Sequence, residues 1–472
     1  MTSVSALLPR LQTILGSDKL LHERNDCWPY GYDNSRRHAL PEAVVFPSRH
    51  EQVVEIVRLC FEHRIPLIAR GRGTGTTGAT VPQTGGIVLS TEHMNQPPRI
   101  DAANRLAIVQ PGVTNQQLQD AAAKHGFFWP PDPTSAAFCT VGGNLAYNSA
   151  GPRAVKYGTP RENTLGLTAV DGTGRTLKVG THTTKGVVGY DLTRLLIGSE
   201  GTLGIITEAV LKLTPLPEVT YTLQAIYRDI HSAAQAVSRI MAQPVVPCAL
   251  ELIDGQAIEM VRNFSELDLP SQAGAMLMIE VDGPRAGIEE NAAAVSHAAQ
   301  NNGLVSLKQA RTQSETEALW ATRKALSPSL RNVAPKKINE DVVVPVSHIP
   351  QLISGLEQLS STHRIKIVNF GHAGNGNIHV NLLVNPDDAE EMQRAHACLD
   401  EVFSLVLALD GSLSGEHGVG LEKRDYVERE LGSAALEVMH AIKQVFDPHG
   451  ILNPQKTLPP ISPTAPAGDA PA

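Results

Sequence analysis

Two spacings of apolar residues recur along the 472-residue chain and predict an alternation of short strands and amphipathic helices. Before residue 215, short apolar runs predict strands at residues 41–47, 67–69, 87–89 and 106–112. Apolar positions three or four residues apart predict helices in the same region, at residues 50–63 and 114–125. After residue 215 the predicted strands are 219–227, 249–253, 275–281 and 342–345, and the predicted helices are 230–241, 287–302, 317–326 and 390–409. A single hydrophobic core does not grow to this chain length, so we expect separate domains.

The clearest turn signal lies at residues 373–377, whose sequence is AGNGN. Alternating apolar runs flank it at residues 365–370 and 378–384. Asn and Gly tolerate the positive φ that tight turns demand, so the pattern predicts a β-hairpin. This hairpin places His372 where the first strand ends and His379 where the second begins.

The hairpin can bring two imidazoles together. Side chains alternate between the faces of a strand, so His379 and Asn381 share a face. Antiparallel pairing can place His372 opposite them, within reach of one ion. Two imidazoles and a carboxylate from elsewhere form an open metal site. A histidine pair beside a turn also occurs as an exposed polar rim, so these residues alone leave both interpretations open.

Three glycine-rich segments occur in the first half of the chain: residues 70–80 (RGRGTGTTGAT), 140–151 and 198–207 (GSEGTLGIIT). Glycines let backbone N–H groups approach an anion closely, and Thr hydroxyls add donors. The first segment lacks the Gly-Lys-Ser/Thr of a P-loop and does not open a helix as GxGxxG does. One such segment is typical of a surface loop. Three together predict a long anionic cofactor held by backbone amides of loops, without a helix-dipole motif.

The composition narrows the class of protein. The chain has 40 basic and 48 acidic residues and no basic run, which argues against a nucleic-acid partner. No apolar run reaches the roughly 20 residues that span a bilayer, so we expect a cytoplasmic protein whose membrane contact, if any, is peripheral at the inner face. The cysteines show no CxxC spacing, which favours reduced thiols; they are Cys27, Cys60, Cys139, Cys248 and Cys398.

The sequence resembles the vanillyl-alcohol oxidase / p-cresol methylhydroxylase superfamily of FAD proteins, and within it the D-2-hydroxyacid dehydrogenase branch. That branch includes D-lactate dehydrogenase, D-2-hydroxyglutarate dehydrogenase and the flavin subunit of glycolate oxidase. The matching motifs span nearly the whole chain: residues 70–78, 131–135, 140–151, 198–207, 415–420 (GEHGVG) and 446–457 (FDPHGILNPQKT). The resemblance implies an α+β protein with a two-subdomain FAD-binding domain of the vanillyl-alcohol oxidase type and an α+β cap domain containing an antiparallel sheet.

The change of pattern after Pro215 and the resemblance together predict the domain organisation. The expected parts are an FAD-binding domain (1–215), a cap or substrate domain (216–410), a C-terminal segment that returns to the FAD domain (411–457) and a disordered, Pro- and Ala-rich tail (458–472).

The resemblance implies FAD bound by the glycine-rich segments. Relatives with covalent flavin use a histidine in the first segment or a cysteine in a CPTVG-type segment. Here the first segment has no histidine, Phe138 stands at the cysteine position and Cys139 at the proline position, so we expect dissociable FAD. The residues expected to bind FAD are Arg70, Gly71, Arg72, Gly73, Thr74, Gly75, Thr76, Thr77, Gly78, Pro133, Thr134, Ser135, Thr140, Val141, Gly142, Gly143, Asn144, Asn148, Gly151, Tyr157, Glu200, Gly201, Gly204, Ile205, Ile206 and Asn453.

The resemblance also implies a substrate site. Arg323, three residues after a tryptophan on a predicted helix, would bind a substrate carboxylate, because an arginine fork binds carboxylates bidentately. Ser327 would add a hydroxyl, Lys337 a further cation, and Asn381 would orient the ligand or substrate. Taken alone, Arg323 and Lys337 equally fit solvated surface charges.

In the GEHGVG motif the resemblance makes Glu416 the third metal ligand, beside His372 and His379. Zinc is the first choice of divalent cation for such a set, with manganese or iron as alternatives. His417 would be the general base. The expected reaction is metal-assisted oxidation of a small anionic D-2-hydroxy acid to the 2-keto acid, by hydride transfer to FAD.

Electrons would then pass to an external acceptor, which is a quinone, a cytochrome or an electron-transfer flavoprotein. Two alternatives stay open. One is a flavin-binding subunit of a multi-subunit complex like glycolate oxidase, and the other is an FAD enzyme like alkyl-dihydroxyacetone-phosphate synthase, which catalyses no net oxidation. We also expect a homodimer.

Overall fold

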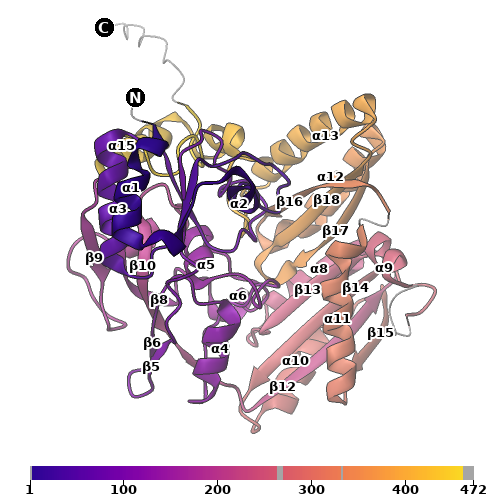
Figure 1. The fold of residues 1–472 in the computed structure, drawn as a ribbon. Coiled ribbons are helices and arrows are strands. Elements are labelled where there is room, and N and C mark those ends of the chain that lie inside the picture. Colours follow the sequence, from indigo (N-terminus) through magenta and orange to yellow (C-terminus); the bar gives the residue numbers. More distant parts are fainter. Residues whose placement is uncertain (1–2, 263–268, 331–332, 461–472) are drawn as a thin grey trace, which may run out of the picture.

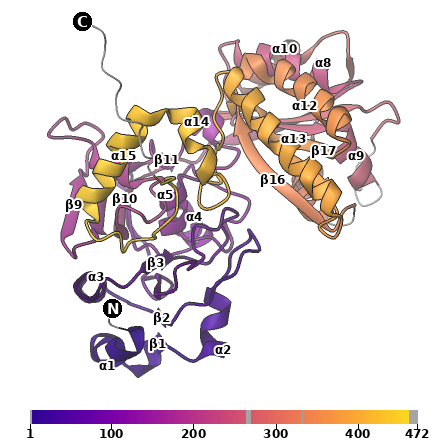
Figure 2. The ribbon, with the colours of Figure 1, turned by 90° about the horizontal axis from the view of Figure 1, so that it is seen from above.

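The computed structural model of the chain describes residues 3–262, 269–330 and 333–460. Figure 1 shows two lobes side by side, one built from the first half of the chain and one from residues beyond 216. The helix α15 (Ser433–Phe446) lies back on the first lobe, as both ribbon views show (Figures 1 and 2). The tail predicted at residues 458–472 lies outside the described residues from residue 461 on.

A four-stranded sheet, in the order β1-β2-β4-β3, opens the first lobe. Its strands β2, β4 and β3 are parallel, and β1 is antiparallel to β2. Buried aliphatic residues of the strands pack against two amphipathic helices. The apolar residues of each helix recur at the 3.6-residue helical period and so form one face. The elements are α1 (Val4–Leu15), β1 (Leu20–Leu21), β2 (Ala43–Val45), α3 (His50–His63), β3 (Leu67–Arg70) and β4 (Ile87–Ser90).

A second, antiparallel sheet completes this lobe in the order β5-β6-β10-β8-β9. Its core includes the fully buried Trp129 and packs against α4, α5 and the end of α15. Its elements are β5 (Arg99–Asp101), β6 (Leu106–Val109), α4 (Asn115–Ala123), α5 (Val141–Tyr147), β8 (Thr164–Val170), β9 (Thr176–Gly180), α7 (Leu192–Leu196) and β10 (Ile205–Lys212). Nearby lie β7 (Phe127–Phe128), which pairs with β11 (Thr214–Pro215), and α6 (Ala154–Tyr157).

The second lobe is a seven-stranded antiparallel sheet in the order β15-β12-β14-β13-β17-β18-β16. The strands are β12 (Val219–Tyr227), β13 (Ala249–Asp254), β14 (Ala275–Gly283), β15 (Leu304–Gln309), β16 (Lys336–Val343), β17 (Lys366–His372) and β18 (Asn377–Val384).

Helices cover the two faces of this sheet unequally. One face packs against α8 (Ile230–Met241), α10 (Ile288–Ala299), α12 (Ile349–His363) and α13 (Ala389–Ala408), and forms the largest core. The other face is covered in part by α9 (Gly255–Arg262) and α11 (Gln313–Ser329). The uncovered part of that face, near the β17–β18 turn, contributes side chains to a cavity.

The α+β class and the antiparallel cap sheet are confirmed, whereas two local predictions are wrong. The second glycine-rich segment is not a loop throughout, because residues 141–147 form the helix α5, capped by the Thr140 side chain. The edge strand β16 starts at Lys336 rather than at residue 342, because its polar residues pair with β18 along the whole strand. The domain boundaries stay predictions.

All five cysteines lie in the described part of the chain and are free and buried. In the same part, no helix combines the length and the apolar character that a bilayer crossing requires.

Candidate active site

A cavity of about 480 Å³ lies between the two lobes. One wall consists of residues from the three glycine-rich segments, and we call it the glycine wall. The opposite wall comes from α11, the cap sheet and the 411–420 loop, and we call it the charged wall. The charged wall comprises Arg323, Lys324, Asn339, Phe370, His372, His379, Glu416 and His417.

Most of the residues predicted to bind FAD line the glycine wall. They are Arg70, Gly71, Arg72, Gly73, Thr74, Gly75, Thr76, Pro133, Thr134, Ser135, Thr140, Gly142, Gly143, Asn144, Glu200, Gly201, Gly204, Ile205 and Ile206. Seven others are not brought to the cavity: Thr77, Gly78, Val141, Asn148, Gly151, Tyr157 and Asn453. A glycine-rich segment has an inner and an outer side, and the spacing of the motif does not tell them apart.

Several of these seven residues lie outside the cavity lining and contact the segments that form the glycine wall or the cap domain. Val141 is buried in the core of the first lobe. The Asn453 amide donates to the Glu200 backbone carbonyl at 2.7 Å. The Tyr157 hydroxyl donates to Asp282 Oδ2, on the cap strand β14, at 2.7 Å. These residues therefore hold the segments and the lobes together rather than face a cofactor.

The first glycine-rich segment folds around the buried guanidinium of Arg70. Arg70 Nη1 donates to the Tyr32 carbonyl at 2.7 Å and to Thr80 Oγ1 at 3.2 Å. Gly73 has a φ of +65°, and a Cβ there would overlap the guanidinium. Arg70 thus braces the loop in addition to lining the cavity.

The first two segments approach so closely that side chains would separate them. A Cβ on Gly71 would overlap Thr140 Oγ1, and one on Gly75 would lie 2.5 Å from the Tyr147 hydroxyl oxygen. That hydroxyl is buried at the cavity and has no hydrogen-bond partner among the described residues. The narrow backbone cradle and the unpaired donor both suit a long phosphate-containing cofactor.

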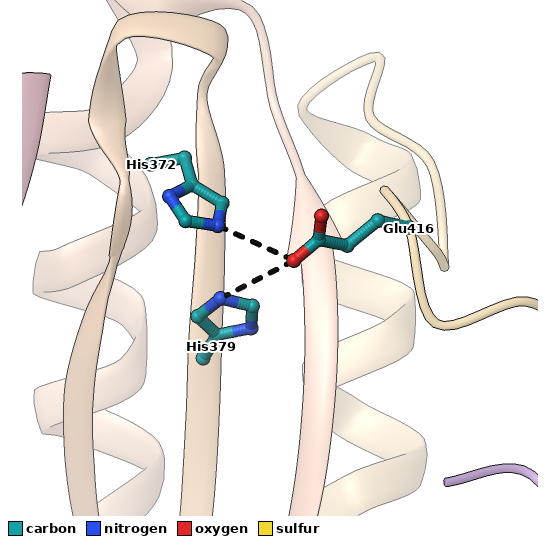
Figure 3. Close-up of side chains that lie close together, drawn as sticks. All are labelled: His372, His379 and Glu416. Atoms are coloured by element: carbon teal, nitrogen blue, oxygen red, sulfur yellow. Dashed lines mark hydrogen bonds and ion pairs between the residues drawn. The ribbon is translucent and has the colours of Figure 1, made fainter. Parts of the chain in front are cut away.

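The charged wall holds a compact group of metal-ligand atoms (Figure 3). His372 Nε2 lies 3.2 Å from Glu416 Oε1, and His379 Nε2 lies 3.9 Å from the same oxygen. One ligand atom from each residue falls within 4.8 Å of the others. Zinc binds nitrogen and oxygen ligands at about 2.0–2.2 Å. The three side chains can therefore share one cation after small side-chain movements.

The hairpin register explains how the two histidines meet. Phe370 pairs with His379, and His372 pairs with Asn377, so the histidines are diagonal rather than directly opposite. Their rings lie 5.2 Å apart at 82°. Gly376, with a φ of +74°, allows the tight turn between the strands. The predicted hairpin is confirmed, with this shift in register.

The charges in this group are strongly coupled. Burial by itself would lower the pKa of His372, but the carboxylates of Glu251 and Glu416 raise it to about 10. Burial and the neighbouring His417 and His372 hold the pKa of His379 well below its usual range, so its imidazole is neutral. Burial would raise the pKa of Glu416, yet His372 and His379 hold it well below its usual range. A cation would thus replace the proton that His372 shares with Glu416.

A buried carboxylate, Asp341, fixes the loop that carries Glu416 and His417. Its Oδ2 accepts from three successive backbone N–H groups, those of Gly415, Glu416 and His417, at 3.0, 2.6 and 2.8 Å. It also pairs with the buried ammonium of Lys423. Burial opposes its ionisation, but His417 and Lys423 hold the pKa of Asp341 well below its usual range.

The same loop is bonded to the first lobe. The Glu200 carboxylate accepts from the backbone N–H groups of Val419 and Gly420 at 2.7 and 2.8 Å. Gly151 N donates to Glu416 Oε2 at 2.8 Å. The second and third glycine-rich segments therefore contact the metal-ligand loop directly, so that the two walls meet at its edge.

His417, predicted to be the general base, lies beside the candidate metal ligands. Its ring stacks on His379 with centroids 5.2 Å apart and an interplanar angle of 16°. His417 Nδ1 lies 3.6 Å from Asp341 Oδ1, so a carboxylate faces one ring nitrogen. The imidazole lines the cavity next to the proposed metal ligands.

The residues predicted to bind substrate are only partly assembled. Arg323 lines the cavity, with its Nε donating to Glu251 Oε2 at 2.6 Å. Ser327 lies on α11, but its side chain is outside the described part of the structure. Lys337 lies on β16 and is not brought to the cavity. Asn381 is fully buried, and its amide donates to the Val368 carbonyl at 3.1 Å.

Asn339, rather than Asn381, reaches the cavity. The two asparagines are register partners on β16 and β18, and Asn339 Nδ2 donates to Asn381 Oδ1 at 2.6 Å. Lys324 and Phe370 also line the charged wall although sequence analysis did not select them. Phe370 lies two residues before His372 on the same strand face, so strand alternation was an available signal for it. Lys324 is adjacent to the selected Arg323.

The glycine wall suits a long phosphate-containing cofactor, and the charged wall opposite it carries ionisable groups, an arrangement that fits a flavin-dependent oxidoreductase. Residues 41–180 match the family described as "FAD binding domain", and residues 216–457 match "FAD linked oxidases, C-terminal domain". The chain therefore belongs to the FAD-linked oxidase family and has its FAD-binding domain.

The names of similar proteins are consistent with membership of this family. The chain is 40% identical to the glycolate oxidase subunit GlcD of Bacillus subtilis (strain 168), over 90% of this chain and 91% of that protein. It is 33% identical to D-2-hydroxyglutarate dehydrogenase of Stutzerimonas stutzeri (strain A1501), over 96% and 98%. The solved structure of p-cresol methylhydroxylase with substrate bound has the same fold, with a TM-score of 0.77, 19% identity and 96% coverage of both chains.

Proposed function

We propose that the protein oxidises a D-2-hydroxy acid to the corresponding 2-keto acid, using dissociable FAD and a divalent cation, most simply Zn²⁺. The observation that carries the proposal is the group His372, His379 and Glu416 on the wall opposite the glycine-rich segments. The names of the relatives support it, since glycolate and 2-hydroxyglutarate are both 2-hydroxy acids.

The reaction removes two electrons and two protons from the R–CHOH–COO⁻ group. Bound FAD supplies the acceptor for the Cα hydrogen and its electron pair. A cation on the His372, His379 and Glu416 group supplies a Lewis acid that lowers the pKa of the substrate hydroxyl. Every other task falls to side chains of the charged wall.

Arg323 would bind the substrate carboxylate, because its guanidinium lines the cavity beside the proposed metal ligands. His417 would accept the hydroxyl proton, and Asp341 would keep its ring in place and stabilise the imidazolium that forms. Asn339 would donate to a substrate oxygen. Phe370 supplies an apolar surface against which the Arg323 guanidinium lies, 5.0 Å above the ring centroid.

The protein can pass electrons to an external acceptor either alone or as one subunit of a larger complex. The relative from Bacillus subtilis is named as a subunit, which favours a chain that works within a larger complex. An external acceptor is required in either case, since FAD must be reoxidised. Reduction of a soluble dye by the isolated chain separates the two cases, because a chain that depends on a partner would reduce its flavin but not the dye.

The proposal is tested by anaerobic reduction of the bound flavin, followed by absorbance, with a panel of D- and L-2-hydroxy acids. We expect bleaching by at least one D-acid and not by its L-enantiomer. His379→Ala should retain FAD and lose zinc, and its flavin should reduce about 10⁴-fold more slowly, since Lewis-acid stabilisation is worth several kcal/mol. If dithionite bleaches the flavin but none of the 2-hydroxy acids does, the proposal is refuted and the synthase-like alternative is favoured.

A further inference from the structure

The buried carboxylate of Glu251 connects two residues with different proposed roles. Glu251 lies on β13 and is only 1% exposed. Its Oε1 is 2.6 Å from His372 Nδ1, and its Oε2 accepts from Arg323 Nε at 2.6 Å. One side chain therefore contacts a proposed metal ligand and the proposed substrate arginine. Neither the sequence motifs nor the proposed reaction assigns it a role.

The fold places Glu251 there through strand pairing. Glu251 and His372 are register partners on the neighbouring strands β13 and β17, so their side chains project from the same face of the sheet. Arg323 reaches this face from α11, which lies on the same side. A buried carboxylate without partners would cost several kcal/mol, and here each oxygen has one charged or polar partner.

We propose that Glu251 is a positioning residue that orients His372 for the cation and couples the cation site to the substrate-binding arginine. The inference rests on the proposed function. An ionised carboxylate only accepts hydrogen bonds, so the Nδ1 of His372 must carry the hydrogen. The remaining nitrogen, Nε2, then presents its lone pair toward Glu416 and His379 when a cation is bound. Such carboxylate–histidine contacts fix the tautomer and raise the basicity of a ligand.

The shared carboxylate also links the two ligands energetically. Arg323 and His372 both interact with the negative charge of Glu251. Removing the charge of one partner therefore changes how strongly Glu251 interacts with the other. If Arg323 is neutralised, Glu251 becomes a buried charge with a single partner, and a cation at His372 compensates it better than before. Loss of the arginine charge should therefore strengthen cation binding, and only while Glu251 is present.

The first test measures zinc affinity by competition with a fluorescent chelator, on full-length FAD-loaded protein stripped of metal. Glu251→Gln keeps the size but removes the charge, and we expect about 10–100-fold weaker zinc binding. Glu280→Gln is the matched control. Glu280 is a buried carboxylate on the adjacent strand β14, bonded to Trp320 Nε1 at 2.6 Å and outside the cavity lining. We expect the zinc affinity of Glu280→Gln to stay within about threefold of that of the unchanged protein.

The second test measures the coupling. Arg323→Gln alone should raise zinc affinity by about 3–10-fold, and the gain should vanish when it is combined with Glu251→Gln. Flavin absorbance and circular dichroism verify that each variant is folded. Should Glu251→Gln not fold, Glu251→Asp replaces it, and we expect weaker zinc binding because the shortened side chain cannot reach both partners.

The outcomes separate the inference from the proposed function. Equal zinc affinities for the unchanged protein and Glu251→Gln, or an Arg323→Gln effect that persists in the double variant, would overturn the role of Glu251 and leave the metal site standing. Absence of zinc binding by the unchanged protein would overturn both.

Discussion

The two walls of the cavity differ in what forms their surface. The glycine wall presents backbone and small side chains, and close approach at Gly71 and Gly75 sets its shape. The charged wall presents imidazole, carboxylate and guanidinium groups, and two of them, those of His372 and Arg323, bond to the buried carboxylate of Glu251. A cofactor common to many enzymes can be bound by backbone, whereas the groups that act on one substrate need side chains with tuned charge.

Among variants that keep the three candidate metal ligands, the largest effect should come from removing the proposed general base on the charged wall. His417→Ala should slow flavin reduction by a 2-hydroxy acid about 10³-fold, because the group proposed to accept the hydroxyl proton is lost. FAD affinity should stay unchanged, since the glycine wall is untouched. Stopped-flow absorbance measures the rate. His348→Ala, which removes a histidine bonded to the Leu409 carbonyl outside the cavity, is the control. An unaltered rate for His417→Ala would assign the base elsewhere.

Removing the carboxylate that anchors the 415–420 loop should lower stability as well as activity. Asp341→Asn leaves the buried Lys423 short of one counter-charge and weakens three backbone hydrogen bonds. We expect a loss of about 3 kcal/mol in the free energy of unfolding, measured by urea denaturation. Asp254→Asn, another buried aspartate that accepts backbone hydrogen bonds but pairs with no lysine or arginine, should cost less. Equal losses would show that Lys423 does not depend on Asp341.

The reverse experiment alters the glycine wall alone. Gly71→Ala places a Cβ against Thr140 Oγ1, so the first two segments must separate, and FAD affinity should fall about tenfold. Zinc affinity should not change. Gly283→Ala, where a Cβ meets open space, should leave both affinities as they are. Titration of apoprotein with FAD, followed by flavin fluorescence, gives the result. A parallel loss of zinc affinity would mean that the walls do not respond independently.

A smaller effect concerns the pH dependence of stability behind the charged wall. Burial raises the pKa of Glu340 from its ordinary 4.5 to about 7. A raised folded-state pKa favours the protonated fold, so this contribution is complete below pH 4.5 and is lost as the pH rises to 7. Glu340→Gln should therefore gain at most about 3 kcal/mol over the unchanged protein at pH 8, less the contribution of the Glu340–Lys423 ion pair that it removes, and nothing at pH 4.5. Urea denaturation across this range measures the difference, and a pH-independent gap would contradict it.

Local patterns were sufficient for the hairpin and its two histidines, whereas the architecture and Glu416 were implied by the family resemblance. The β-hairpin follows from Gly376 and its alternating flanks, and His372, His379 and Glu416 lie where the motifs placed them together. The sequence could not show that Glu251 joins them, because that contact depends on the pairing of β13 with β17, more than a hundred residues apart.

The predicted residues that do not line the cavity have a related physical explanation. Asn381 and Asn339 are cross-strand partners, and which of the two amides reaches the cavity depends on side-chain rotamers. Lys337 was selected without knowledge of the β16 register, whereas Lys324 on α11 lines the wall. Residues such as Asn148 belong to a recognised motif but bond outward, to the backbone N–H of Arg161 at 3.1 Å.

The bonds of the 415–420 loop also constrain how the protein is made. The loop backbone donates hydrogen bonds to Glu200 in one lobe and to Asp341 in the other. Both carboxylates precede the loop in the sequence, so the ribosome synthesises the loop after them. During translation each lobe can therefore emerge and begin to collapse while lacking the segment that joins them. The loop's bonds to Glu200 and Asp341, and the candidate ligand set that includes Glu416, can therefore form only after residues 415–420 have been synthesised.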